Sequence, residues 1–98
     1  MRRKLKFLYQ RIVRGWDDSE TWSLDYTIAK FTLPRLKRFK ELNGSYPHQL
    51  SMKEWDAILD DIIYVFEAYK EDNIDGCDQD RRKKGLEYFG KYFSSLWS

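Results

Sequence analysis

The stretch of residues 50–69 constrains the fold most, because it predicts one well-defined helix. Ser51 can cap the first turn and Glu54 can return the hydrogen bond, which is the capping-box pattern. Leu50 and Trp55 add a hydrophobic staple around that cap. Apolar residues then recur at helical spacing: Trp55, Ile58, Leu59, Ile62, Ile63, Val65, Phe66 and Tyr69. A helix that is apolar over more than one face is expected at the centre of a small bundle.

A first helix is predicted before Gly15, which is a typical residue for a helix C-terminus. Its apolar stripe has the spacing i, i+3, i+4 and i+7. The stripe consists of Leu5, Leu8, Tyr9 and Ile12.

A second helix is expected from about residue 19 to residue 42, with Asp17 as its N-cap and Glu20 completing a capping box. Its apolar positions are Trp22, Ala29, Leu33 and Leu36, flanked by Ile28 and Phe39. Pro34 lacks a backbone donor and clashes with the preceding turn, so the helix is kinked there or split into two, and we favour the kink. Residues 43–47 are predicted to form a loop.

A last helix is predicted to start near Asp78 or Asp80. Its stripe consists of Leu86, Phe89, Phe93, Leu96 and Trp97. Gly85 and Gly90 either allow close helix approach or are simply tolerated. The chain is therefore expected to be all-α, one domain over residues 1–98, with about four helical segments in an antiparallel bundle. Residues 1–8 form a basic N-terminal extension of the first helix.

Charge is segregated along the chain although the net charge is only +2. Residues 1–14 carry six bases and no acid, and residues 30–41 carry five bases against one acid. Residues 53–75 carry eight acids against two bases. Two interpretations remain open: an acidic helix packed beside basic ones, or a bipolar surface that binds an anion at one end.

The sequence offers few groups for catalysis or for holding a metal. Cys77 and His48 are the only residues of their types, which is too few for a zinc site and leaves one pair for Cys–His catalysis. The acidic turn at residues 71–79 imitates part of a calcium-binding loop but has Arg82 where a bidentate Glu is needed. No glycine-rich phosphate loop is present. We therefore expect no enzyme, metal or cofactor, and the short apolar runs predict no membrane partner.

Bases and aromatic residues alternate between residues 11 and 38, a combination found in phosphate, base and protein recognition. The candidate binding residues are Arg11, Arg14, Trp16, Trp22, Asp25, Lys30, Arg35 and Arg38. Asp25 lies three residues after Trp22, on nearly the same helix face. Its carboxylate either accepts from Arg14 or from the Trp16 indole, or belongs to a ligand or partner site.

Several short motifs, taken in order and spacing, resemble a group of small proteins encoded by tailed bacteriophages and prophages. The motifs are Arg14–Asp18, Thr21–Asp25, Leu33–Phe39, Tyr46–Pro47, Glu54–Asp60 and Phe89–Trp97. The resemblance covers roughly residues 9–98 and excludes the basic first eight residues. No catalytic site is established for that group, so none is carried over. The resemblance implies a phage accessory protein acting in the cytoplasm of the bacterial host.

Three functions follow from these observations as hypotheses. The first is a non-catalytic accessory protein that binds a host protein or nucleotide signal, inhibiting or sequestering part of an antiviral defence system. An exposed Trp or Tyr patch would favour a protein partner, and a concave pocket lined by Arg and aromatic residues would favour a nucleotide. The second is a nucleic-acid-binding module that uses residues 1–14 and Lys30–Lys40. The third is a structural or assembly component of the phage particle, and a homo-oligomer is compatible with all three.

Overall fold

The computed structural model describes residues 2–42 and 45–97, and within them the predicted all-α fold is confirmed. The elements are α1 (Arg2–Arg14), the 3₁₀ turn η1 (Asp18–Thr21), α2 (Leu24–Leu42), α3 (Met52–Lys70), α4 (Gln79–Lys91) and the 3₁₀ turn η2 (Phe93–Ser95). Of the predicted loop at 43–47, residues 43 and 44 lie outside the described part.

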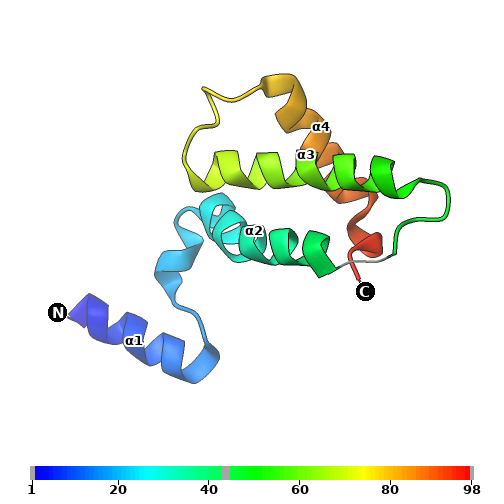
Figure 1. Ribbon diagram of the computed structural model, residues 1–98. Helices are drawn as coiled ribbons and strands as arrows, with labels where there is room; N and C mark the ends of the chain where they lie inside the picture. Colours follow the sequence, from blue (N-terminus) through cyan, green and yellow to red (C-terminus); the bar gives the residue numbers. More distant parts are fainter. Residues whose placement is uncertain (1, 43–44, 98) are drawn as a thin grey trace.

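Helix α3 is the centre of the bundle, as its wide apolar surface predicts. The capping box is formed: the Glu54 amide donates to Ser51 Oγ at 3.1 Å, and the Ser51 amide donates to Glu54 Oε1 at 3.0 Å. Helices α2 and α4 pack against α3 but not against each other, so α3 lies between them (Figure 1). The most deeply buried large side chains all come from α3: Trp55, Leu59, Ile62 and Val65. The core is therefore built around one helix.

Helix α2 runs through Pro34 without interruption, so the split alternative is wrong. It buries Ala29, Leu33 and Leu36 against α3. It begins at Leu24 and not near residue 19, because a separate 3₁₀ turn precedes it. Side-chain hydroxyl groups in this turn compete with backbone amides for the carbonyl groups that a regular helix would use. Thr21, for example, donates its hydroxyl to the Asp18 carbonyl at 2.7 Å.

Helix α4 begins after Asp78, whose carboxylate accepts from the Arg81 amide at 3.1 Å. Gly85 is buried against α3. The helix ends at Lys91, sooner than the predicted stripe requires, and this changes where the last aromatic residues lie. Phe93 and Trp97 are exposed, so their predicted place on an inward-facing stripe is wrong. Tyr92 is buried instead, edge-on to the core tryptophan of α3.

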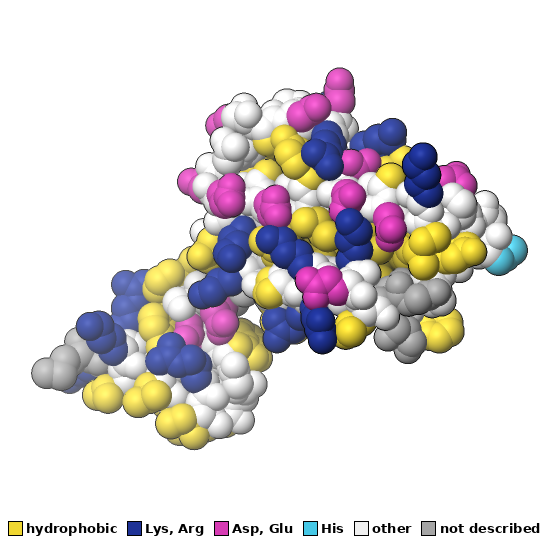
Figure 2. Space-filling view, viewed as in Figure 1, with side chains coloured by type: hydrophobic (Ala, Val, Ile, Leu, Met, Phe, Trp, Pro, Cys, Tyr) yellow, Lys and Arg dark blue, Asp and Glu magenta, His cyan; other side chains and the backbone are white. Residues whose placement is uncertain are grey.

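Helix α1 stands apart from the other three helices as an arm (Figure 1). It contacts η1 and the residues that flank this turn but no other helix, and none of its residues is buried. Its apolar stripe was expected to pack into the bundle and instead faces outward. The space-filling view shows hydrophobic side chains along the side of the arm turned away from the body (Figure 2). Amphipathic periodicity therefore identified the helix but not what covers it.

Part of the segregated charge is paired within the chain. Lys37 and Lys40 of α2 reach acids of α3: Lys37 Nζ lies 3.1 Å from Glu67 Oε1 and Lys40 Nζ lies 2.5 Å from Asp60 Oδ1. Arg81 of α4 lies 2.8 Å from an Asp61 oxygen. The first interpretation of the charge pattern, an acidic helix beside basic ones, thus describes α3. Over residues 2–42 and 45–97, no helix has the length and apolar character to cross a membrane.

Candidate binding groove

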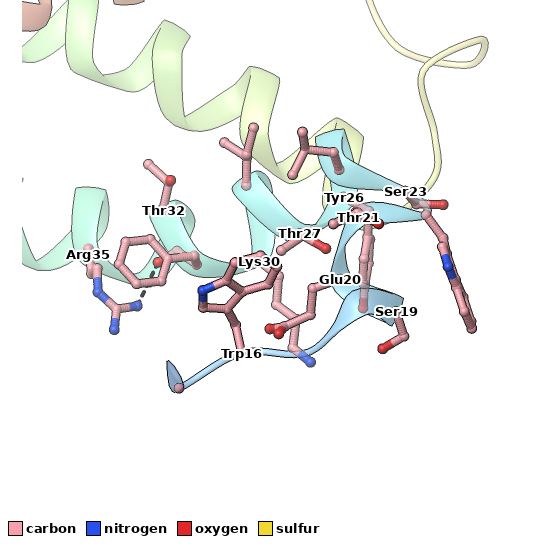
Figure 3. A pocket seen from close by; sticks show the side chains of 15 residues that line it. Trp16, Ser19, Glu20, Thr21, Ser23, Tyr26, Thr27, Lys30, Thr32 and Arg35 are labelled. Atoms are coloured by element: carbon pink, nitrogen blue, oxygen red, sulfur yellow. Dashed lines mark hydrogen bonds between the residues drawn. The ribbon is translucent and has the colours of Figure 1, made fainter. Parts of the chain in front are cut away.

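An open hollow of about 1120 Å³ lies between the segment that connects α1 to α2 and the outer face of α2. One wall consists of residues 15–16 and 19–23, which connect α1 to α2, and the other consists of α2 residues between 24 and 35. Figure 3 shows side chains from both walls, with Trp16 and Glu20 facing Lys30 across the space. We call this hollow the α2 groove.

Asp17 fixes the connecting wall, and its side chain is almost fully buried. It accepts from the Ser19 amide at 2.9 Å and also from the Ser19 hydroxyl. The Asp17 amide donates to Glu20 at 2.7 Å, which completes the predicted capping box on η1. Arg11 of the arm lies 2.6 Å from the other Asp17 oxygen. The Ser19 hydrogen bonds, followed by the Arg11 guanidinium, hold the pKa of Asp17 below its ordinary 3.8 against the opposing effect of burial.

Asp18 ties the polar side of the arm to the same turn. It accepts from Gln10 and Arg14 at 2.8 and 2.7 Å, and Lys6 lies 3.6 Å away. The Gln10 hydrogen bond, with Arg14 next, lowers the pKa of Asp18 from 3.8. The arm therefore docks through its polar side, which leaves its apolar side free.

The connecting wall contains two partly exposed tryptophans, Trp16 and Trp22. Trp16 is 45% exposed, and the Arg14 guanidinium lies 3.7 Å from its ring centre. Trp22 is 59% exposed, with the Arg3 guanidinium 4.2 Å from its ring and Phe7 edge-on at 5.5 Å. The arm thus stacks on both rings without covering them.

The opposite wall is the outer face of α2, which is apolar with two cations. Leu24, Ile28 and Phe31 follow one another at helical spacing and are 44–60% exposed. Arg35 donates to the Phe31 carbonyl at 2.7 Å and stacks on the Phe31 ring. Neither Lys30 nor Arg35 forms an ion pair within the described residues.

The apolar surface continues beyond this hollow along α2. A smaller hollow of about 230 Å³ shares Phe31 and Arg35 with the first and extends to Phe39 and Leu96. Together the two hollows follow most of a 19-residue helix, a length of about 28 Å at 1.5 Å per residue.

Of the eight residues predicted to bind, four line the groove: Trp16, Trp22, Lys30 and Arg35. Arg11 and Arg14 instead support its wall through the two aspartates. Arg38 lies outside it and pairs with Glu41 at 2.9 Å.

Asp25 also lies outside the groove, at the exposed start of α2. It accepts from the Tyr26 amide at 2.9 Å. It does not meet Arg14, which binds Asp18 and the Trp16 carbonyl, so the expected lock on Arg14 or the Trp16 indole is wrong.

The prediction missed Ile28 and Phe31 as groove residues. Their signal was a second apolar row on α2, parallel to the row that packs on α3. Among the described residues no cluster of His, Cys, Asp or Glu could hold a metal ion. His48 precedes α3 and Cys77 follows it, so the two residues lie at opposite ends of that helix. No protein-family model, curated protein or solved structure matches the chain.

Proposed function

We propose that this chain is a non-catalytic protein that acts by occupancy, holding an acidic amphipathic helix of a partner protein in the α2 groove. The observation that carries the proposal is the exposed apolar row on α2, flanked by two cations that form no ion pair among the described residues. A helix lying in a groove buries one apolar side and keeps its polar side in water.

The apolar lining favours a protein over a nucleotide. The lining does combine Arg35 with aromatic residues, among them Trp16 and Trp22, as expected of a nucleotide site. Leu24, Ile28 and Phe31 nevertheless offer no hydrogen bonds to a base, and they extend over about two helical turns. A small ligand is normally enclosed by its site, whereas this groove is open and continues towards Leu96. An extended apolar surface of this shape suits a helix that presents residues at i, i+3, i+4 and i+7.

The cations favour acidic residues beside the partner's apolar stripe. Lys30 and Arg35 lie on the α2 wall, and no carboxylate in residues 2–42 or 45–97 pairs with them. Charges at the rim of an interface select the partner and raise the association rate more than they raise affinity.

A nucleic-acid-binding module, our second hypothesis, has less support, because many of the bases it requires are already paired. Lys6, Arg11 and Arg14 face the two aspartates of the turn, and Lys37 and Lys40 face acids of α3. Acids beside these bases would repel phosphates.

Together with the resemblance to phage-encoded proteins, the groove leads us to propose a host component as the partner. The consequence would be inhibition or sequestration of part of an antiviral defence system inside the bacterium. Occupancy of a partner's helix requires no catalytic group.

The test is quantitative capture from an extract of the bacterium that carries the gene, using the tagged wild-type chain and two double variants. Ile28→Glu with Phe31→Glu removes the apolar row, and Lys30→Glu with Arg35→Glu reverses the charge. The first variant is expected to reduce a stoichiometric captured protein at least tenfold, because a buried large apolar side chain contributes about 1.5–3 kcal/mol. The second is expected to reduce it as well, because like charges would then face the acidic residues of the partner and slow association.

Leu86→Glu is the matched control, since Leu86 is 38% exposed on α4 and away from the groove. It is expected to leave capture unchanged. Equal capture by all variants would contradict the groove as the binding site. Nucleic acid or a nucleotide recovered in place of a protein would contradict the proposed class of partner.

A further inference from the structure

The exposed side of α1 carries an inference independent of the groove. We propose that α1 is an interfacial helix that lies on the surface of an anionic phospholipid bilayer. This would revise the expectation of no membrane partner, because short apolar runs exclude a spanning helix but not a helix that lies on the surface.

The outward stripe of α1 is continuous and lacks a partner within the described chain. Its five large residues are 47–75% exposed: Leu5, Leu8, Tyr9, Ile12 and Val13. They share one side of a 13-residue helix about 20 Å long, which suits a helix lying in the plane of a membrane surface and is too short to span one. Tyr9 adds a ring of the kind enriched at the headgroup level.

The contacts of the opposite side fix which face the arm presents. Phe7 packs edge-on against Trp22, and Gln10 and Arg14 bind Asp18. Because these groups hold the polar side against η1, the stripe points away from the body, as Figure 2 shows. A flat surface can therefore reach the whole stripe without meeting the bundle (Figure 1).

Charge complementarity identifies the occupant. The arm holds six of the chain's 18 bases and none of its 16 acids. Arg2 and Lys4 border the stripe, are exposed, and form no ion pair in the described part of the molecule. Bases beside an apolar stripe are the arrangement that anionic headgroups attract.

A second copy of the chain fits the stripe less well. Pairing two α1 stripes would bring two helices without acids into contact, and like charges across an interface oppose association. A bilayer covers the apolar residues and neutralises Arg2 and Lys4 at the same time.

The experiment measures co-sedimentation of the full chain with phosphatidylcholine vesicles and with vesicles in which a third of the lipid is phosphatidylglycerol. We expect binding to the anionic vesicles and at least tenfold less to the neutral ones. Arg2→Gln with Lys4→Gln is expected to weaken anionic binding about 30-fold, from about fivefold per base. Ile12→Glu is expected to weaken it at least tenfold, because the Ile12 side chain would no longer enter the apolar layer.

Leu42→Glu is the matched control, because Leu42 is 63% exposed at the far end of α2. It is expected to bind like the wild type, with circular dichroism showing that each variant keeps its helices. Absence of binding to the anionic vesicles would overturn the proposal, as would equal loss with Leu42→Glu. A dimer in analytical ultracentrifugation that Ile12→Glu dissociates, without vesicle binding, would also overturn it and assign the stripe to a second copy.

Discussion

Replacing Gly85 by alanine tests the packing of the bundle most sharply. Helix α4 approaches α3 so closely that a Cβ at this position would lie 2.5 Å from the Asp61 carbonyl oxygen and nearer still to Val65 Cγ2. The carbonyl belongs to the backbone of the central helix, so no change of side-chain rotamer relieves that contact. The two helices would have to separate.

The size of the effect follows from two opposing contributions. Overpacking a close-packed interface costs typically about 1–3 kcal/mol, with the backbone contact favouring the upper end. Alanine regains about 1 kcal/mol of helix propensity relative to glycine. We expect a net loss of about 2 kcal/mol in the free energy of unfolding from Gly85→Ala, or roughly 8–16 °C in Tm for a domain of this size.

Gly90→Ala is the internal control, because it lies on the same helix and a Cβ there would meet nothing within 4 Å. Its expected effect is a gain of up to about 1 kcal/mol from propensity alone. Urea unfolding followed by circular dichroism measures both variants. If Gly85→Ala stabilises the protein as much as Gly90→Ala, the close contact between α3 and α4 does not exist and the described packing is wrong.

Three further predictions concern the caps and the arm. Ser51→Ala is expected to lower the free energy of unfolding by about 1 kcal/mol in the same assay, because it removes the acceptor for the Glu54 amide. Gly15→Ala is expected to cost about 1 kcal/mol, since Gly15 has φ +84° with space around it and only the backbone is strained. The pKa values of Asp17 and Asp18 are lowered from the ordinary value of 3.8. The two carboxylates therefore stabilise the docked position of α1 fully above pH 3.8, and this stabilisation is lost as the pH falls below that value. Tryptophan fluorescence should therefore change in acid, and Asp17→Asn with Asp18→Asn should shift the protein towards the acid form at neutral pH.

The sequence was most informative where local chemistry and burial agree. Ser51 and Glu54 specify where α3 starts, and the apolar residues after them surround that helix, so its central place could be predicted. Asp78 likewise marks the start of α4. Caps depend on neighbours in the chain and need no knowledge of the tertiary structure.

Contacts between distant segments were harder to predict. The stripe of α1 has the periodicity of a core helix, but periodicity does not say whether another element covers it. The choice between close approach and tolerance at Gly85 and Gly90 depends on which side of α4 faces α3, and only Gly85 lies there.

The candidate site was half predictable from composition. Alternating bases and aromatic residues pointed to the region of the chain that forms the α2 groove. Composition does not indicate that Arg14 supports the wall of the groove while Arg35 lines it. These roles depend on the turn at residues 17–20, which sets the position of α1 relative to α2. Ile28 was predicted to flank the core row and Phe31 was not singled out, because the periodicity of a helix with two apolar rows does not indicate which row is buried.

The most direct test of the central claim is site-specific photo-crosslinking in the same bacterial extract. A photoreactive phenylalanine analogue replaces Phe31 in the groove or, as the control, Leu86 on α4. We predict that the Phe31 position crosslinks to one segment of one protein, an amphipathic helix with acidic residues beside its apolar side, and that the Leu86 position does not. Crosslinks from Phe31 to nucleic acid or a nucleotide, or equal crosslinks from both positions, would contradict the account.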